Sequence, residues 1–511
     1  MPERLLLIGI DAMEKDLVLR WAGEGLLPSF ERLLRDSSWA FVGNPPGLVS
    51  GGAWQSFSTG VSPARHGLYN AYEYFDSNSY GVDFYATGDP RFSPFWEVLS
   101  QAGKRVAVID VPYSFLSAEL TGIQVVDWIT HTRMTDGALL TVPAGLAAEI
   151  ETRFGIDPLG LGKGSPCDRN PPRSRQELQA YRQTLIDRIE AKTAFCEELL
   201  ARERWDLFLP AFCECHCVGH HCWHVHDERH PRHDKAVAAD VGDPVRDVYV
   251  AIDRAVGRLV ERAGPDMTVM VYSSFGVTAA YSGTHLLDEI LLRLDGKRPN
   301  RVRHEVVDRL RQAWRRAPNQ VRDLLRPLRQ GPWEAIYQSS IVPDRATRRF
   351  FEVKANDATG GVRINLVGRE AKGLVEPGEQ YDRLCEELTE SLLSFVNVDT
   401  ARPLVREVVR TDRIYRGERL DRLPDLLVHW NRDAPILGIF SPKTGLIENR
   451  HLGIRSGDHT DTGLVFMSGS NVVPGRRNRD VAVTDLAPTV TAHLGVALAT
   501  SDGSPIGVAV A

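Results

Sequence analysis

Four short apolar runs constrain the fold of this chain more than any other feature of its sequence. They are continuous and not alternating, which is typical of strands that are buried on both faces of a parallel sheet. Segments with helical spacing lie between them, of which Arg175–Arg202 is the longest. Repeated strand–helix units of this kind predict an α/β fold, a doubly wound and mostly parallel sheet with helices on both faces. The runs lie at residues 4–11, 104–112, 205–211 and 266–274.

The length of the chain predicts an additional region besides this sheet. At 511 residues it exceeds one ordinary domain, so a large core with a substantial insertion is expected. Residues 294–345 are Arg-rich and amphipathic, with Pro and Gly breaks, and short strand patterns follow. We therefore predict a core of residues 1–293 and 446–511, with an inserted helical and small-sheet accessory region at 294–445. Residues 114–172, rich in Gly, Pro and Thr, predict an irregular region of the core.

Charge, apolar runs and cysteine content indicate which partners and which compartment suit this chain. The formal net charge of −6 indicates neither nucleic acid nor an anionic membrane as a partner, and no apolar stretch approaches the length of a bilayer span. The run Leu5–Ile10 is too short for the apolar region of a signal peptide. Seven cysteines, an odd number without a framework pattern, favour a reducing compartment. We expect a cytoplasmic protein; its oligomeric state stays open.

The segment Phe212–Asp227 carries the strongest chemical signal. It holds four of the seven cysteines and five of the fifteen histidines, and it directly follows the apolar run at 205–211. Side chains at the carboxyl end of a strand lie where open α/β sheets build their sites. His216 and His220 are four residues apart, so on a helix they share one face and could hold one metal ion, and His224 would extend that face. Packing, or a surface patch that binds metal opportunistically, is the alternative.

The cysteines of this segment suggest a different role. Cys213, Cys215 and Cys217 alternate, so they cannot all face one ion, and the chain has no CxxC pair. We interpret them mostly as packed small hydrophobic residues, with a cysteine-ligand site as the alternative.

Two further residues are candidates for the site. Asp11 ends the first apolar run, where a carboxylate either caps the next helix or binds a metal ion. Ser50 precedes two glycines and a helical segment, a layout that presents a hydroxyl at a helix N-terminus, where an anion is favoured. Taken alone, each of these positions favours a plain N-cap role.

Taken in order, these segments resemble the alkaline phosphatase superfamily, in its type I phosphodiesterase/nucleotide pyrophosphatase branch. The resemblance covers nearly the whole chain, and residues 58–67, Ser-Thr-Gly-Val-Ser-Pro-Ala-Arg-His-Gly, are a specific motif within it. It implies phosphoryl or sulfuryl transfer by two metal ions through a covalent enzyme intermediate. The matching positions are Asp11 (the first metal aspartate), Ser50 (the nucleophile), residues 214–223 (an aspartate and a histidine four residues later), His459 (a late histidine ligand) and residues 483–496 (a closing helix).

The sequence departs from the family pattern at ligand positions. His216 stands where the family has an aspartate, and Ser274-Phe275 replaces an Asp-His pair, so two ligands of the metal beside the nucleophile are missing. His216, His220 and His459 would then form a three-histidine site, which suits zinc with a fourth position open. Such a site could make a hydroxide nucleophile from bound water. Another divalent metal is also possible, and a second ion could use spare histidines, namely His221, His224, His226 or His285.

We therefore expect a metal-dependent hydrolase or transferase, with Ser50 as nucleophile and Asp11, His216, His220 and His459 as metal ligands. Its substrate would be a small anionic molecule, a phosphate or sulfate ester or a related bond, with a phosphodiester favoured because a single ion neutralises less charge. A catalytically degenerate relative that binds a ligand or partner is the alternative. Metal storage through the Cys/His cluster is a third hypothesis, which gives no account of the rest of the chain.

Overall fold

The four apolar runs form neighbouring strands of one large sheet. The computed structural model describes residues 3–45, 47–69, 73–84, 92–135, 138–160, 171–297, 345–356, 358–448, 455–470 and 472–507. They form two compact units: Met1–Tyr72 with Ala86–Ala280 and Gly453–Ala511, and Glu73–Tyr85 with Tyr281–Leu452.

The first unit is built on a ten-stranded sheet with the order β20-β2-β19-β9-β1-β8-β5-β6-β7, in which β21 also pairs with β2. Strands β9, β1, β8, β5 and β6 are parallel to one another, and β19 and β7 run antiparallel to their neighbours. The strands are β1 (Leu5–Ile10), β2 (Ser38–Gly43), β5 (Val106–Ile109), β6 (Gly122–Val126), β7 (Leu140–Val142), β8 (Leu207–Phe212), β9 (Thr268–Ser273), β19 (Thr462–Ser468), β20 (Gly475–Arg476) and β21 (Val481–Ala482).

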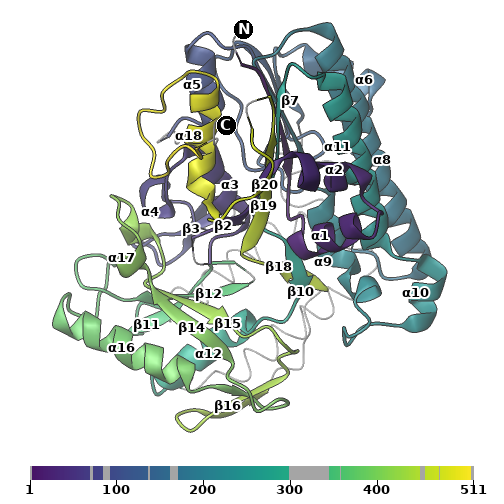
Figure 1. The fold of residues 1–511 in the computed structure, drawn as a ribbon. Coiled ribbons are helices and arrows are strands. Elements are labelled where there is room, and N and C mark those ends of the chain that lie inside the picture. Colours follow the sequence, from purple (N-terminus) through teal and green to yellow (C-terminus); the bar gives the residue numbers. More distant parts are fainter. Residues whose placement is uncertain are drawn as a thin grey trace. The chain divides into compact units, whose positions relative to one another are not determined.

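Helices cover both faces of this sheet, which confirms the predicted fold class (Figure 1). One layer contains α1 (Lys15–Gly23), α2 (Pro28–Asp36), α8 (Arg175–Arg202), α9 (Glu214–His226), α10 (Lys235–Val241) and α11 (Pro244–Ala263). The other contains α3 (Ser50–Thr59), α4 (Pro63–His66), α5 (Phe95–Gln101) and α18 (Leu486–His493), which follows the short helix η3 (Val483–Asp485). Every helix within the described ranges is too short or too polar to cross a membrane.

Helix α8 has the bounds predicted from the sequence, and a reciprocal cap explains where it begins. The Ser174 hydroxyl accepts a hydrogen bond from the Glu177 amide at 3.2 Å, and the Glu177 carboxylate accepts one from the Ser174 amide at 2.9 Å. Both bonds satisfy amides that have no partner within the helix.

The prediction of an irregular region at residues 114–172 is wrong for part of this segment. It contains β6, β7 and the helix α6 (Leu146–Arg153), although residues 136–137 and 161–170 are outside the described ranges. A buried polar residue, Gln124, interrupts the apolar pattern of β6 and so conceals the strand. Its side chain is satisfied locally, because it accepts from the Ser117 amide at 2.7 Å and donates to the Phe115 carbonyl at 2.9 Å.

The second unit contains three antiparallel sheets within the described residues, together with helices. It has a four-stranded sheet of order β11-β12-β15-β14, a three-stranded sheet of order β13-β16-β17 and the pair β3-β4. Most of the predicted Arg-rich segment, residues 298–344, is outside the described residues, so the predicted division at 294 and 445 stays a prediction. The elements are β3 (Glu73–Phe75), β4 (Val82–Phe84), α12 (Thr284–Leu294), β11 (Phe350–Val353), β12 (Thr359–Ile364), α16 (Glu379–Leu393), β13 (Val396–Asn397), β14 (Val405–Arg410), α17 (Thr411–Ile414), η2 (Leu420–Arg422), β15 (Leu426–Trp430), β16 (Gly438–Ser441) and β17 (Gly445–Glu448).

His66, in the motif at residues 58–67, is a structural residue of the first unit. Its Nδ1 accepts from the Leu68 amide at 3.0 Å, so its Nε2 carries the proton and donates to the Ser56 hydroxyl at 3.0 Å. Burial lowers the pKa of His66 to about 3. In the unfolded chain the histidine pKa is near 6.5, so the unfolded chain binds the second proton, which would go to Nδ1, more tightly than the folded protein does. The stability that His66 contributes is therefore complete above about pH 6.5 and is lost as the pH falls from there toward 3.

We predict that replacing His66 reduces the sensitivity of the fold to acid. In His66→Gln the amide keeps a donor and an acceptor but does not titrate. The free energy of unfolding of the wild type should fall between pH 7.5 and pH 5 by about 2 kcal/mol more than that of the variant. Urea unfolding at both pH values measures this difference. An equal change in the free energy of unfolding between pH 7.5 and pH 5 in the two proteins would contradict the assignment.

Candidate metal centre

The candidate site lies at the carboxyl edge of the parallel sheet. Asp11 directly follows β1, and α9 begins directly after β8. The Asp11 amide donates to the carbonyl of Phe212, the last residue of β8, at 2.7 Å. The register of two neighbouring strands therefore brings Asp11 to the start of the histidine-bearing helix.

Helix α9 presents His216 and His220 on one face, as their spacing predicts. Both side chains are buried, and their ring centroids are 4.5 Å apart. Between them, Gly219 leaves room for the strand β10 (Val277–Ala279), since a Cβ atom at this position would be 2.9 Å from Val277 Cγ2.

The antiparallel partner of β10 is β18 (Gly457–His459), which brings His459 to the same place. His459 is the last residue of this short strand. Its ring centroid is 4.7 Å from that of His216 and 4.8 Å from that of His220.

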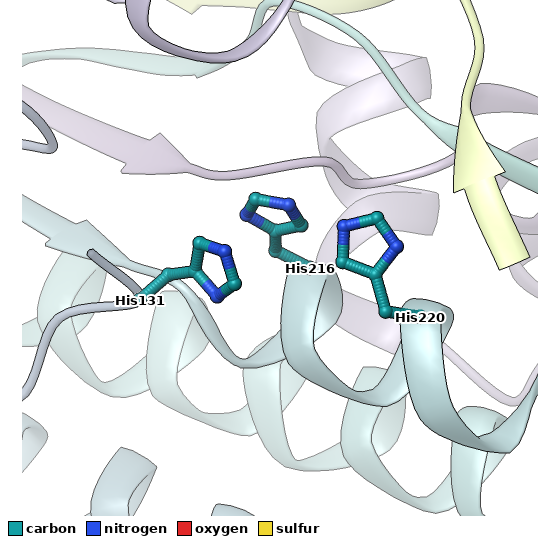
Figure 2. A group of neighbouring side chains, drawn as sticks. All are labelled: His131, His216 and His220. Carbon is teal, nitrogen blue, oxygen red and sulfur yellow. The ribbon is translucent and has the colours of Figure 1, made fainter. Parts of the chain in front are cut away.

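A fourth histidine, His131, was not among the predicted site residues. It lies in the loop after β6, and its ring centroid is 3.7 Å from that of His216. Figure 2 shows the rings of His131, His216 and His220 side by side, two from α9 and one from this loop. One nitrogen from each of these rings lies within 4.8 Å of the others, close enough for one metal ion. The preceding strand is followed directly by a carboxylate, Asp127, as β1 is by Asp11, but Gln124 interrupts its apolar pattern and conceals this signal in the sequence.

In three of these histidines the Nδ1 atom, which we call the outer ring nitrogen, has a defined contact outside the cluster. His216 Nδ1 is 2.6 Å from Asp11 Oδ2, and His220 Nδ1 donates to the Gly457 carbonyl at 2.8 Å. His131 Nδ1 is 3.5 Å from Cys217 Sγ. Histidines that bind metals almost always engage their second nitrogen in this way, which fixes the ring and its tautomer.

The inner nitrogens also fit a metal ion. His216 Nε2 and His459 Nε2 face each other at hydrogen-bond distance, 2.7 Å. The Nε2 atom of His220 is buried and has no hydrogen-bond partner among the described residues. Burial and the neighbouring Arg455 hold the pKa of His220 well below its ordinary value, so this ring stays neutral and able to coordinate. The donor set therefore suits a metal such as zinc.

Asp11 contacts the ring of His216. Its Oδ1 accepts from Trp54 Nε1 at 2.8 Å, and its Oδ2 from His216 at 2.6 Å. Burial alone would raise the pKa of Asp11, but the charge and hydrogen bond of His216 lower it below the usual range. The carboxylate is therefore ionised and holds His216. A direct bond from Asp11 to a metal stays a prediction.

Ser50 begins α3, the helix that carries Trp54 one turn later. Its Oγ is 2.7 Å from the Tyr113 hydroxyl, which is 3.4 Å from the hydroxyl of Thr132, the neighbour of His131. Hydrogen bonds thus connect Ser50 to the loop of His131. The role of Ser50 as nucleophile stays a prediction.

Five non-glycine residues near this edge adopt left-handed backbone conformations. Such residues cost about 1–3 kcal/mol each and cluster at functional sites. They follow the ends of β1, β5 and β6 or begin α3, and their φ angles are 56° at Ala12, 55° at Ser50, 54° at Asp110, 59° at Tyr113 and 64° at Asp127.

Phe275 is at a position where the family resemblance implies a second-metal histidine. It is fully buried, and its ring centroid lies 4.9 Å from that of His459 in an edge-on arrangement. An apolar ring therefore packs against the cluster. Within the described residues, His131, His216 and His220 are the one group close enough to share an ion.

The cysteines of α9 and its N-cap are buried, as the sequence predicts. Burial raises the pKa of Cys213 and of Cys215 well above the ordinary value, which disfavours the thiolate form that binds metals.

The profile of the family "Type I phosphodiesterase / nucleotide pyrophosphatase" matches residues 5–452. No curated protein matches the sequence significantly. Three similar solved structures are an inactive variant of murine ectonucleotide pyrophosphatase/phosphodiesterase 5 in complex with AMP (12% identity, 98% of this chain and 97% of that chain covered, TM-score 0.50), phosphonoacetate hydrolase from Sinorhizobium meliloti 1021 in complex with phosphonoformate (12%, 98% and 96%, 0.51) and wild-type alkaline phosphatase PafA (14%, 99% and 99%, 0.53). At these identities the structures support the fold alone.

We predict that Asp11→Asn weakens zinc binding. The variant keeps an oxygen near His216 but loses the charge that fixes the ring, so the Kd for zinc should rise about 10- to 100-fold. Competition with a chromophoric chelator measures this Kd.

Asp243→Asn is the matched control. Asp243 Oδ2 is 2.8 Å from Nδ1 of His226, the last residue of α9, so this Asp–His pair lies outside the cluster. Asp243 also caps α11, and asparagine caps a helix about as well as aspartate, so the variant should keep the fold and leave the zinc Kd unchanged. Equal effects of both substitutions would contradict a specific role for Asp11.

Proposed function

The chain belongs to the type I phosphodiesterase/nucleotide pyrophosphatase family of phosphoester hydrolases, and we propose that it is a metal-dependent hydrolase of a small phosphoester with a single histidine-bound ion. The observation that carries this proposal is the convergence of buried imidazole nitrogens. One nitrogen each of His131, His216 and His220 lies within 4.8 Å of the others, and His459 Nε2 is 2.7 Å from His216 Nε2.

In this proposal the histidines bind the ion and Asp11 orients one of them. His131, His216 and His220, with His459 beside them, would hold the ion, which when bound supplies Lewis-acid polarisation of a phosphoryl oxygen. Asp11 orients His216 through its 2.6 Å contact. Because the four histidines add no negative charge when neutral, they leave the charge of the ion available to an anionic substrate.

Ser50 is the proposed nucleophile. Ser50 is the first residue of α3, and backbone amides at this helix end have no partners inside the helix and favour an anion. The Tyr113 hydroxyl, 2.7 Å away, orients Ser50 Oγ by a hydrogen bond. Attack by this oxygen would form a phosphoryl–serine bond while the bond between phosphorus and the leaving alkoxide breaks, and the serine proton would leave with the alcohol. Water would then hydrolyse the phosphoryl–serine ester and restore Ser50.

We expect a phosphodiester. Two of the similar structures are complexes, one with AMP and one with phosphonoformate, and both molecules are small phosphorus-containing anions. A diester carries one negative charge and a monoester up to two, so a single ion with a neighbouring apolar Phe275 favours the diester.

Metal analysis and turnover of defined variants test the proposal. The wild type should contain about one zinc per chain and hydrolyse bis(4-nitrophenyl) phosphate faster than 4-nitrophenyl phosphate. In His216→Ala both metal and turnover should be lost. In Ser50→Ala the metal should remain, while kcat falls by on the order of a thousandfold.

Ser58→Ala is the matched control for Ser50→Ala. Ser58 lies on the same helix, and its hydroxyl donates to the Gln55 carbonyl at 3.1 Å, so metal content and turnover should stay at wild-type levels. Full turnover in Ser50→Ala would exclude Ser50 as the nucleophile. Bound metal without turnover of either ester would favour a ligand-binding relative, and turnover without metal would exclude metal dependence.

A further inference from the structure

The backbone just before His131 is held by buried cations. Three consecutive carbonyl groups each accept a hydrogen bond from a different positively charged side chain. The bonds run from Arg133 Nη2 to the Trp128 carbonyl at 2.9 Å, from Lys192 Nζ to the Ile129 carbonyl at 2.7 Å and from Arg188 Nη2 to the Thr130 carbonyl at 3.1 Å.

The amides of the same loop are held as well. The Asp110 carboxylate accepts from the Trp128 amide at 2.9 Å and from the Ile129 amide at 2.8 Å. Lys192 joins this carboxylate at 3.0 Å and also donates to the Ala211 carbonyl of β8 at 2.7 Å. The three donors of one ammonium group thus connect the loop after β6 to the ends of β5 and β8.

The charges of this group balance, and its side chains are excluded from solvent. Three carboxylates, those of Asp110, Asp157 and Glu214, face the three cations, and the side chains of all six residues are 0% exposed. Burying ions costs several kcal/mol each, and apolar residues of similar size often stabilise a fold equally well. Stability alone is therefore a weak reason for three cations here, whereas fixing one loop conformation is a sufficient one.

Two of the cations come from a single helix. Arg188 and Lys192 are four residues apart in α8 and so share one face. Arg188 also lies 3.5 Å from Glu214, in the first turn of α9, the helix that carries His216 and His220. The same helix face therefore fixes the loop of His131 and contacts the helix of the other two histidines.

We propose that Arg188 and Lys192 are positioning residues for the metal site, which hold residues 128–130 so that the ring of His131 stays beside His216 and His220. This inference rests on the proposed function, because it requires that the cluster binds a metal ion. Neither cation touches the ion or the substrate; both act through His131.

A double-mutant cycle between Lys192 and His131 tests this proposal. Zinc affinity is measured by competition with a chromophoric chelator in the wild type, Lys192→Met, His131→Ala and the double variant. Lys192→Met should raise the zinc Kd about tenfold or more in the wild-type background and leave it unchanged in the His131→Ala background. Circular dichroism and thermal unfolding of the metal-free proteins show that each variant is folded.

Arg363→Met is the matched control for the loss of a buried cation. Arg363 is buried in the second unit, where it donates to the Leu423 carbonyl at 2.7 Å and contacts Glu370 at 2.7 Å. This substitution should lower the unfolding temperature without changing the zinc Kd. If Lys192→Met does not fold, Lys192→Arg, which keeps the charge but not the three-way geometry, replaces it in the same cycle.

The outcomes separate this inference from the proposed function. An equal loss of zinc affinity in both backgrounds, or no loss in either, would overturn the positioning role and leave the metal site intact. A wild type that binds no zinc, or whose affinity His131→Ala and His216→Ala leave unchanged, would overturn the metal site and the inference with it.

Discussion

The buried ammonium group of Lys192 is the interaction on which the carboxyl edge of the sheet depends. It contacts Asp110 after β5, the Ile129 carbonyl after β6 and the Ala211 carbonyl in β8. Without it, polar groups at three neighbouring strand ends would lose a partner inside the protein, at a cost of about 1–3 kcal/mol each. One cation thereby keeps together the loops and helices from which the candidate site is built.

The resulting site differs in kind from the two-metal pattern that the family resemblance implies. His216 stands at an aspartate position, and Phe275 fills a place where the resemblance implies a histidine ligand. The carboxylate that remains, Asp11, accepts hydrogen bonds from Trp54 and His216. A negative carboxylate thus contacts the ring of His216 on the side away from the cluster. In the proposed function this arrangement would keep the positive charge of a single ion for the substrate, which would suit a less highly charged ester.

The sequence predicts the parts of this site that follow a regular period. His216 and His220 share a face because they are four residues apart on a helix, and Asp11 ends an uninterrupted apolar strand. His131 has no such signal, since Gln124 interrupts its strand and a loop of irregular conformation follows. The helical pattern of α8 likewise predicts its bounds but not the burial of Arg188 and Lys192. Their surroundings come from β5, β6, β8 and α9, which are distant in the sequence.

The sequence by itself therefore determined the doubly wound α/β core, the family and the ligand-type residues on α9, because strand burial, helical spacing and local motifs are short-range properties. Only the tertiary structure decided that His131 joins the cluster, that Asp11 contacts a ring and that Phe275 packs against His459. The register of the parallel strands and the pairing of β18 with β10 set these distances. Such pairings join residues up to hundreds of positions apart, and no local pattern encodes them.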